Sequence, residues 1–566
     1  MPGEPRAGPR QVQDGRGRAP REVGHRASIQ QLAQAPADLL VIGGGIVGAG
    51  IARDAAMRGF RTLLVDQGDL GSGTSSRSSR LIHGGLRYLE EGDFRLVFEA
   101  LRERRTLLGI APHLVRPLPF IFPVHRGDRL PLWKVWAGVW LYDLLALFRN
   151  VRGHRILGKR ALLRAEPMLR ERGLVGGALY YDAQCDDARL VIATARSAAR
   201  HGALIANYMA VERLVLADGQ VRGAEVRDRI TGETARLTAS VVVNATGPWC
   251  DLVRRMEDPQ ARPLLRLTKG VHVMVPRKRV GHQAAIAMTS PIDGRVMFIL
   301  PWGDFSYIGT TDTDFSGTPD EVRPDPDDVV YLLRSANACF PNAHLSERDV
   351  IASWAALRAL IIRDGTGIPA SHVSREHLIT RGPAGLLTIA GGKLTTYRVM
   401  ARELVDLAAD QLHAASGRPR PPRAPTDTEP LPGGEVRDFA PLAAPGLELG
   451  IPARTVDHLL AHYGTEAAAL FNLVRERREL LRPLSPHHPA IEAEVIHVAR
   501  RELAQRVEDV LMRRTHVYYE VPDHGAPAAR RVAELLGEEL GWDAERIAAE
   551  AEEYARAVSE RVPSTS

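Results

Sequence analysis

DLLVIGGGIVGAGIARDAAMRGFRTLLVD, residues 38–66, decides the fold of this chain. It opens with an apolar, partly β-branched run, residues 38–42, of the kind that forms a buried parallel strand. The run passes directly into GGGIVG, which matches the pattern GxGxxG, and a helix-like stretch follows. A second apolar run ends in an acid 18 residues after the last glycine of that pattern. Together these pieces predict a βαβ unit that binds a dinucleotide.

Four residues of this unit have a defined task in dinucleotide binding. Gly43 makes the tight turn, Gly45 lets a pyrophosphate approach the backbone, and Gly48 lets the helix lie close to the strand. The helix N-terminus faces the phosphates, and Asp66 can accept hydrogen bonds from a ribose. The pattern does not distinguish FAD from NAD.

The segment TSSRSSRLIHGGLRYLE, residues 74–90, follows this unit and is unusually polar for its apolar content. It combines small hydroxyl side chains with arginines and with Gly84-Gly85, which permit a close backbone approach or a positive φ. Ser75 and Ser79 are therefore candidates to line the phosphates and ring of the cofactor. The alternative is a surface turn whose serines cap helices.

Further strands and turns are predicted along the chain. Residues 241–243 form a buried strand that breaks at Ala245-Thr246-Gly247, which suits a second close approach to a dinucleotide but also any strand-to-turn junction. Gly391-Gly392 precedes a long amphipathic run and predicts a strand, a glycine turn and a helix. Alternating apolar residues predict half-buried strands at two places, namely at Val271, Val273 and Val275 and at Val296, Phe298 and Leu300.

The composition excludes several classes of protein. The chain has 566 residues, of which 45% are hydrophobic and 25% charged, the balance of a soluble protein with two or more domains. The net charge is +6 and five of the 74 basic residues are lysines, so we attribute the arginine excess to coding bias and expect no nucleic-acid partner. Cys185, Cys250 and Cys339 form no CxxC pattern, which predicts a reducing compartment and no metal site.

Six segments, in this order, resemble the FAD-dependent glycerol-3-phosphate dehydrogenases of the glycine/D-amino-acid-oxidase-like flavoprotein superfamily. They are IGGGIVGAGIARDAAMRG, SSRLIHGGLRYLE, NATGPW, TKGVHVMVP, PWGDFSYIGTTDTDF and GGKLTTYR. With the C-terminal region the resemblance covers about residues 37–550. It implies FAD as the cofactor, glycerol 3-phosphate as the substrate and a hydride transfer from C2 of the substrate to the flavin.

The resemblance also implies roles for individual residues. Arg375, Arg87 and Lys393 are expected to bind the substrate phosphate, with Tyr88 beside them; Lys393 could equally stabilise the reduced flavin. His272 and Arg358 are expected near the reacting hydroxyl, with His272 as the more conventional base. The expected cofactor-binding residues are Gly43, Gly45, Gly48, Asp66, Ser75, Ser79, Gly247, Gly392 and Thr395.

One segment departs from the family pattern. Around Arg358 the family typically reads Gly-Leu-Arg-Pro, whereas this chain has Ala356 and Ala359 at the glycine and proline positions. Alanine does not adopt a positive φ cheaply, and loss of proline removes a constraint on φ. The resemblance therefore does not fix the position of Arg358, and an altered activity or substrate stays an alternative.

The expected fold class is α/β: a Rossmann-like FAD-binding domain with a β-rich substrate cap, followed by an all-helical C-terminal domain. Residues 1–36, rich in Pro, Gly and Arg, predict a disordered tail. Residues 37–414 hold the FAD-binding domain and the interspersed cap. Residues 415–434 form a proline-rich linker, and residues 435–566 form the helical domain.

The electron acceptor is the open question. The favoured interpretation is a dehydrogenase that passes electrons to a quinone; the alternatives are an oxidase that makes hydrogen peroxide, a dehydrogenase of another small 2-hydroxy acid, and a binding module without activity. Residues 130–148 carry tryptophans and aliphatics that suit an interfacial helix or a core helix of the cap. A quinone-linked dehydrogenase is expected to be a cytoplasmic protein held peripherally at the inner face of the cell membrane. Whether the chain forms a homo-oligomer is left open.

Overall fold

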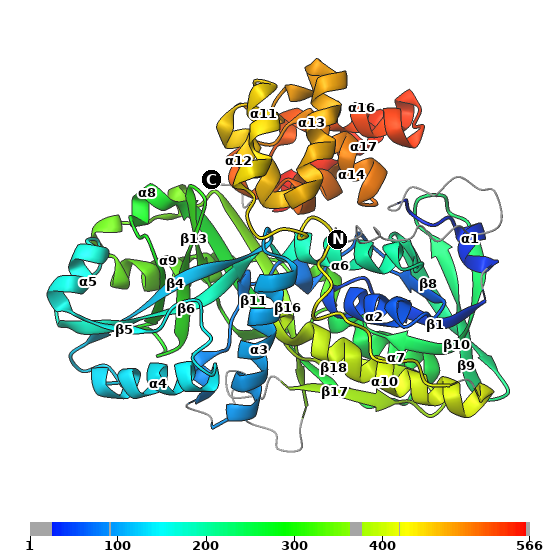
Figure 1. The fold of residues 1–566 in the computed structure, drawn as a ribbon, viewed down its shortest axis with the longest axis horizontal. Helices are drawn as coiled ribbons and strands as arrows, with labels where there is room; N and C mark the ends of the chain where they lie inside the picture. Colours follow the sequence, from blue (N-terminus) through cyan, green and yellow to red (C-terminus); the bar gives the residue numbers. More distant parts are fainter. Residues whose placement is uncertain (1–24, 35, 90–91, 363–375, 418, 562–566) are drawn as a thin grey trace, which may run out of the picture.

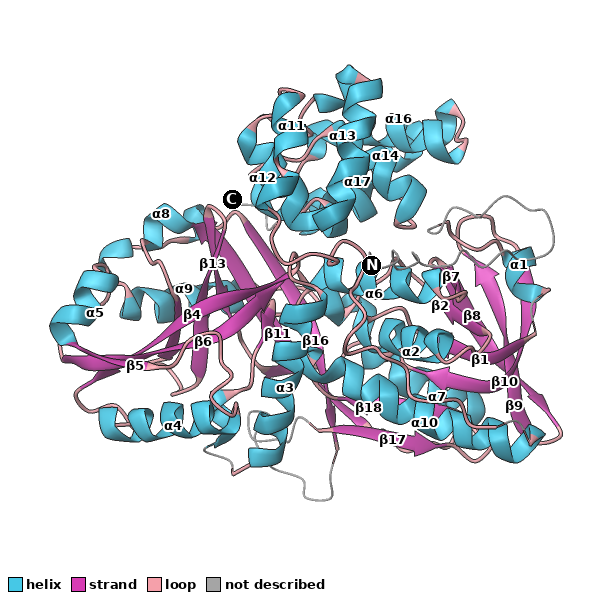
Figure 2. Ribbon diagram, in the orientation of Figure 1, coloured by secondary structure: helices cyan, strands magenta, loops and turns pink. Residues whose placement is uncertain are grey.

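The computed structural model describes residues 25–34, 36–89, 92–362, 376–417 and 419–561. Two sheets lie side by side, and a group of helices from the C-terminal part of the chain lies above their junction (Figure 1). The predicted α/β fold class, with a β-rich cap and a helical C-terminal part, is confirmed. Strands of the two sheets are drawn in magenta in Figure 2.

The first sheet contains the expected βαβ unit at its centre. Its strands run in the order β17 (His377–Arg381), β18 (Leu387–Gly391), β10 (Thr234–Asn244), β1 (Ala37–Ile42), β2 (Thr62–Val65) and β7 (Leu204–Ala206). Strand β1 pairs in parallel with β10 on one side and with β2 on the other. All residues of β1 are buried, as a central parallel strand requires.

Helices and a hairpin cover the two faces of this sheet. On one face lie α2 (Ile46–Met57), α6 (Asp187–Arg200) and α10 (Tyr397–Ser416), whose apolar residues share a core with β1 and β10. On the other face lie α1 (Ile29–Ala33), α7 (Cys250–Glu257), β8 (Met209–Ala217) and β9 (Gln220–Asp228). The carboxyl ends of the parallel strands stay open for a ligand.

The second sheet forms the cap. Its strands run in the order β15 (Thr313–Asp314), β11 (Leu265–Pro276), β14 (Phe305–Gly309), β13 (Val296–Trp302), β12 (Ala285–Thr289), β4 (Val115–His125), β6 (Leu174–Cys185) and β3 (Leu81–Ile82). Strand β16 (Ala352–Ile361) also pairs with β11, and β5 (Arg155–Gly158) pairs with β6. The helices of this part are α3 (Phe94–Ile110), α4 (Leu132–Leu145), α5 (Lys159–Ala165), α8 (Arg277–Val280) and α9 (Pro326–Cys339).

The prediction of a half-buried strand is wrong for β11. Residues 268–275 are all buried, not only the alternating valines. The valines enter a core that includes α9, while Met274 on the opposite face joins a core that reaches the C-terminal helices. Both faces of β11 are therefore covered, which alternation in the sequence did not indicate.

The C-terminal part is helical, as expected. It contains α11 (Ala444–Glu448), α12 (Ala453–Tyr463), α13 (Ala467–Glu476), α14 (Glu492–Arg501), a π-helical turn at Asp509–Arg514, α15 (Val517–Glu520), α16 (Ala529–Leu540) and α17 (Ala544–Arg561). The proline-rich segment before it contacts α2 and α10, two helices that cover the first sheet. Arg53 of α2 donates hydrogen bonds to the carbonyl oxygens of Thr426 and Glu429, at 3.0 and 2.8 Å.

The expectation of a disordered tail over residues 1–36 is wrong for its last part. Residues 29–33 form α1, which begins at a capping box made by Ser28 and Gln31. Ile29 and Leu32 are buried against the first sheet, and the backbone N–H of Ala27 bonds to the carbonyl oxygen of Ile205 at 2.8 Å. Two apolar residues and one cap are enough to hold this short helix. Residues 1–24 lie outside the described part.

Candidate functional site

The glycines of the βαβ unit stand where the structure has no room for a side chain. Gly43 has φ +107°, and a Cβ there would lie 2.6 Å from the carbonyl oxygen of Ala245. A Cβ on Gly48 would lie 1.8 Å from the carbonyl oxygen of Gly43. Gly45 is the N-cap of α2, and a Cβ there would approach only the Ser75 hydroxyl oxygen, at 3.1 Å. The N-terminus of α2 is therefore accessible to a phosphate.

Asp66 follows β2 and is fixed by the turns around it. Its carboxylate accepts hydrogen bonds from the backbone N–H of Gly44, at 2.6 Å, and of Gly68, at 2.8 Å. Burial raises the pKa of this carboxyl group to about 6. Its position beside Gly44, the residue before the N-cap of α2, is compatible with the ribose of a dinucleotide such as FAD.

A cavity of about 290 Å³ lies where the two sheets meet. The βαβ unit contributes Ile46 and Val47, and residues 74–90, which we call the serine-rich segment, contribute Ser75, Ser79 and Tyr88. The lining from the rest of the chain includes Gly247, Gly270, His272, Thr310, Arg358, Gly392, Lys393 and Thr395. The cavity thus brings together segments from both sheets, and we call it the first cavity.

His272 of β11 lies at the wall of the first cavity and is buried. A hydrogen bond of 2.9 Å joins its Nε2 to the hydroxyl of Ser79, and its ring stacks on Trp354 at 5.4 Å. Burial, together with the nearby Arg358 and Arg80, lowers the pKa of His272 to about 3. Its Nδ1 makes no hydrogen bond within the described residues. The ring is therefore neutral near pH 7 and is a weak proton acceptor as long as the cavity holds no ligand.

Gly309 leaves the space that this histidine occupies. A Cβ on Gly309 would lie 2.0 Å from Cδ2 of His272, closer than any side-chain contact allows. His272 and Gly309 are cross-strand partners in the pairing of β11 with β14. The glycine therefore determines where the imidazole lies.

Arg358 lies on β16, opposite Thr268 of β11. Its guanidinium pairs with Asp312 at 2.8 Å and contacts the Thr310 hydroxyl at 3.2 Å. Strand β16 runs unbroken through Ala356 and Ala359, and neither residue has a positive φ. A glycine on the neighbouring strand makes room for Arg358, since a Cβ on Gly270 would lie 3.0 Å from Nη2 of Arg358.

Lys393 and Tyr88 approach the first cavity from the other side. The Lys393 ammonium lies 3.5 Å from the centre of the Tyr88 ring, a cation–π contact. Gly85 has φ +79°, and a Cβ there would lie 2.2 Å from the same ring. Gly84 instead gives room to Tyr142 of α4, whose hydroxyl accepts a hydrogen bond from the Gly84 N–H at 2.9 Å.

Not all predicted residues can be placed. Tyr88, His272, Arg358, Lys393, Ser75, Ser79, Gly247, Gly392 and Thr395 line the first cavity, whereas Gly43, Gly45, Gly48 and Asp66 lie beside it on the βαβ unit. Arg375 and the side chain of Arg87 lie outside the described residues. The roles assigned to all these residues stay predictions.

Two arginines of the serine-rich segment were missed by sequence reasoning. Arg80 is buried, lies 4.3 Å from the centre of the Trp302 ring and pairs with Asp187 at 3.7 Å. Arg77 lines the first cavity, and no described residue makes a hydrogen bond or an ion pair with its guanidinium. Arginines between serines, ahead of a glycine pair, were the signal that could have found them.

A second space of about 460 Å³ shares a wall with the first cavity, and we call it the apolar chamber. Ser79, His83, Tyr88 and Arg358 line both spaces. The remaining lining is mainly apolar and comes largely from β4, α4 and β13: Phe120, Phe122, Val135, Ala137, Gly138, Leu141 and Phe298. A ligand in the chamber would lie against the inner face of α4.

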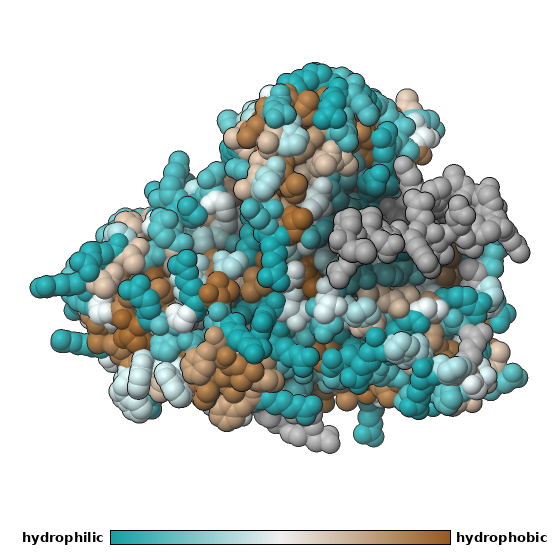
Figure 3. Space-filling view, in the orientation of Figure 1, coloured by the Kyte–Doolittle hydropathy of each residue, from teal (hydrophilic) through white to brown (hydrophobic). Residues whose placement is uncertain are grey.

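The outer face of α4 is exposed and apolar. Trp133, Trp136 and Trp140 are 64%, 49% and 47% exposed, and we call them the tryptophan face. Apolar side chains also gather where α4 ends beside α3 (Figure 3), including Phe94, Phe98, Leu147 and Phe148. No helix among the described residues is long and apolar enough to cross a membrane.

Comparison with known proteins agrees with this architecture. Residues 38–398 match the family model described as FAD dependent oxidoreductase, and residues 424–547 match the C-terminal domain of alpha-glycerophosphate oxidase. Glycerol-3-phosphate dehydrogenase 2 of Mycobacterium tuberculosis is 38% identical, over 93% of this chain and 88% of that protein. The mitochondrial glycerol-3-phosphate dehydrogenase of Homo sapiens is 38% identical over 89% of this chain and 71% of its own.

A solved structure is similar over nearly the whole chain. It is the glycerol-3-phosphate dehydrogenase from Bacillus halodurans complexed with FAD, which has a TM-score of 0.78 and 30% identity. The similarity covers 95% of this chain and 97% of that one. Both sheets and the helical C-terminal part therefore have counterparts in that structure.

Proposed function

The chain belongs to the FAD-dependent glycerol-3-phosphate dehydrogenase family, and we propose that it oxidises sn-glycerol 3-phosphate to dihydroxyacetone phosphate and delivers the electrons to a membrane quinone. The observation that carries the proposal is the first cavity. It joins the open end of a dinucleotide-binding unit to a buried neutral histidine and to two cationic side chains, Arg358 and Lys393.

The residues around the first cavity suit FAD. The N-terminus of α2 would hold the pyrophosphate, Asp66 the ribose, and Ser75 and Thr395 the parts of the cofactor that enter the cavity. Bound FAD supplies the two-electron acceptor for the hydride that leaves C2 of the substrate.

The protein must also hold a small dianion in place. Lys393 lies at the cavity wall, and family resemblance adds Arg87 and Arg375. Charge-assisted contacts to a phosphate contribute about 1.5–3 kcal/mol each, and a clamp on the end that does not react fixes the position of C2. This predicts that free glycerol, which lacks the phosphate, binds poorly.

The C2 hydroxyl must lose its proton as C2 is oxidised. We propose His272 as the acceptor of that proton, since its ring lines the first cavity and is unprotonated near neutral pH. The low pKa makes the ring a weak base in the empty site, and a bound phosphate dianion would raise that pKa. The Ser79 hydroxyl, bonded to Nε2, fixes the ring orientation. Arg358 keeps a positive charge at the cavity wall, where it favours the alkoxide character that develops on the substrate oxygen.

The apolar chamber supports a quinone as the final electron acceptor. It shares Tyr88 and Arg358 with the first cavity, and its apolar walls suit a hydrophobic ring better than a small polar substrate. The tryptophan face lies on the other side of the same helix, α4, and is suited to the interfacial region of a bilayer. We therefore place the protein peripherally at the inner face of the cell membrane.

The experiment is anaerobic bleaching of the flavin in purified protein, followed by reoxidation. Glycerol 3-phosphate should bleach the flavin at concentrations at which glycerol and a 2-hydroxy acid do not, and the product should be dihydroxyacetone phosphate. A soluble quinone analogue should then restore the oxidised spectrum faster than oxygen does. Equal bleaching by glycerol would overturn the substrate assignment.

An oxidase is the second candidate. The match of residues 424–547 to the C-terminal domain of alpha-glycerophosphate oxidase favours it. In that case oxygen would reoxidise the reduced flavin as fast as the quinone does, with one hydrogen peroxide formed per substrate. The substrate and the site residues would be unchanged.

A further inference from the structure

Three residues from distant parts of the chain meet at the junction of the first sheet with the C-terminal helices. Asp186 is the N-cap of α6, His462 lies on α12, and His516 is the residue before α15. Oδ2 of Asp186 lies 2.7 Å from Nε2 of His516 and 3.7 Å from Nε2 of His462. One oxygen and two ring nitrogens thus lie within 4.8 Å of one another.

The protons of the two imidazoles can be assigned from their other contacts. Nδ1 of His462 lies 2.9 Å from the carbonyl oxygen of His458, and Nδ1 of His516 lies 3.1 Å from that of Met512. A carbonyl oxygen only accepts hydrogen bonds, so each Nδ1 carries a proton. In a neutral imidazole the lone pair is then on Nε2, the atom that faces Asp186. Metal-binding histidines are usually held by such a backbone contact through their second nitrogen.

A carboxylate and two nitrogen lone pairs repel one another unless a cation lies between them. A proton on Nε2 of His516 would satisfy the contact with Asp186. It would not give a partner to Nε2 of His462, which is buried and makes no hydrogen bond among the described residues. A divalent ion would satisfy all three atoms together. Two imidazoles and one carboxylate are a ligand set that Zn²⁺ and related ions accept, with room for water as the fourth ligand.

We propose that Asp186, His462 and His516 bind one divalent transition-metal ion of the Zn²⁺ type. The carboxylate is oriented for this, since its Oδ1 accepts a hydrogen bond of 3.0 Å from the Arg189 N–H, which leaves Oδ2 for the ion. The site differs from the substrate site and does not depend on the proposed function.

The ion would link two parts of the molecule. Asp186 comes from the first sheet region, and the two histidines come from the C-terminal helices. The next residue, Asp187, accepts hydrogen bonds from Ser78 and pairs with Arg80, both of the serine-rich segment at the first cavity. A metal at Asp186 would therefore hold the start of α6 and, through it, the wall behind His272.

The test uses the full-length, FAD-loaded protein after treatment with a chelator. Titration with Co²⁺ should give visible absorption bands of a four- or five-coordinate ion that saturate at one equivalent, and Zn²⁺ should abolish them. The thermal unfolding midpoint should rise with either ion. His462→Gln should weaken Co²⁺ binding by more than about 100-fold, since loss of even an outer partner of a ligand costs 10- to 100-fold.

The matched control is His201→Gln, which removes an exposed histidine that pairs with Glu429. It should bind Co²⁺ like the unchanged protein. If His462→Gln loses FAD or unfolds, His516→Gln gives the same comparison. Absence of a one-equivalent Co²⁺ spectrum and of any thermal shift in the unchanged protein would overturn the proposal, and would mean that a proton on His516 neutralises Asp186. Equal Co²⁺ binding by folded His462→Gln would overturn it as well.

Discussion

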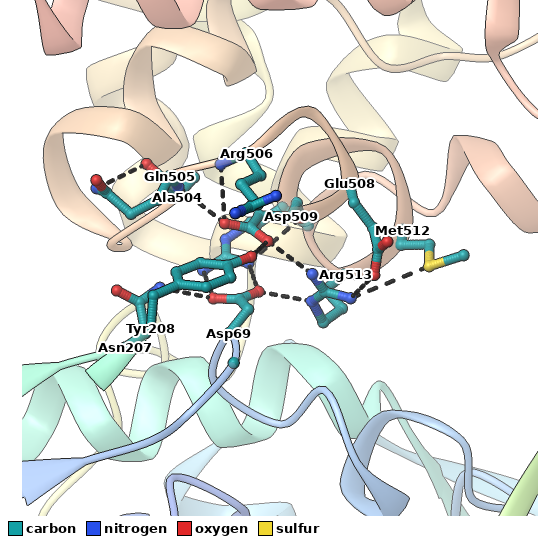
Figure 4. A network of polar contacts seen from close by, with 12 residues as sticks. Asp69, Asn207, Tyr208, Ala504, Gln505, Arg506, Glu508, Asp509, Met512 and Arg513 are labelled. Atoms are coloured by element: carbon teal, nitrogen blue, oxygen red, sulfur yellow. Dashed lines mark hydrogen bonds and ion pairs between the residues drawn. The ribbon is translucent and has the colours of Figure 1, made fainter. Parts of the chain in front are cut away.

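Arg513 donates a hydrogen bond from its Nε to Oδ2 of Asp69 at 2.6 Å, and this pair joins the C-terminal helices to the loop that follows β2. Asp509 pairs with Arg513 at 2.6 Å, so Arg513 lies between two buried carboxylates (Figure 4). Arg514 also contacts Asp69. Asp69 stands only three residues after Asp66. The helical part therefore helps to shape the loop beside Asp66, the proposed ribose-binding carboxylate.

Replacing Asp69 by alanine should destabilise the protein and loosen the cofactor. Two buried arginines would lose their shared partner, which we expect to lower the free energy of unfolding by about 3–5 kcal/mol. FAD content after purification should fall together with the urea midpoint. Arg530→Ala is the control, because its pair with Glu534 is exposed and should change stability by less than about 1 kcal/mol. Full FAD content in a stable Asp69→Ala protein would contradict this role for the loop.

Gly309→Ala should damage catalysis more than folding. The new methyl group would need the space now occupied by the His272 ring, so the histidine must move. Overpacking of this kind costs about 1–3 kcal/mol of stability, while displacing a proton acceptor should lower kcat about 100-fold or more. Steady-state kinetics and thermal unfolding measure the two effects. Gly109→Ala, in α3, meets no atom within 4 Å and should leave kcat unchanged; a normal kcat for Gly309→Ala would argue against His272 as the base.

Binding of FAD to the apoprotein should depend on pH through Asp66. The pKa of this group in the free protein is about 6, so below pH 6 the carboxyl group is mostly protonated and must lose its proton to accept ribose hydroxyls fully. We expect binding to be about tenfold weaker at pH 5 than at pH 7, with little change above pH 7. Fluorescence titration of flavin at several pH values measures this. Asp66→Asn should bind more weakly and lose the pH dependence; an unchanged profile would assign the dependence to another group.

Membrane attachment should depend on the tryptophan face. The double change Trp136→Ser and Trp140→Ser removes two exposed indoles without altering the buried side of α4, so flotation with anionic liposomes should drop several-fold. Quinone-analogue turnover in solution should stay near the unchanged value. Leu252→Ser removes an exposed apolar residue on α7 and serves as the control. Equal flotation of all three proteins would exclude this face as the membrane contact.

Sequence reasoning succeeded where the signal is local. The run from residue 38 to Asp66 predicted β1, α2 and β2 because turn geometry and strand burial act within a few residues. It failed at β11, whose second covered face depends on distant helices, and at Arg80, whose partners Trp302 and Asp187 lie far along the chain. No spacing rule could join Asp186 to histidines of the C-terminal helices, so the proposed metal site could not be predicted from the sequence.

The parallel pairing of β1 also has a consequence for synthesis on the ribosome. Val41 pairs with Val243, and Asn244 in turn pairs with Thr388 of β18. The centre of the first sheet therefore cannot form until the ribosome has synthesised residues that lie far along the chain. Until then one edge of a strand that is entirely buried in the folded protein stands uncovered, which exposes the nascent chain to aggregation. The yield of soluble protein should therefore respond to growth temperature and to chaperone supply more strongly than the finished molecule's stability would suggest.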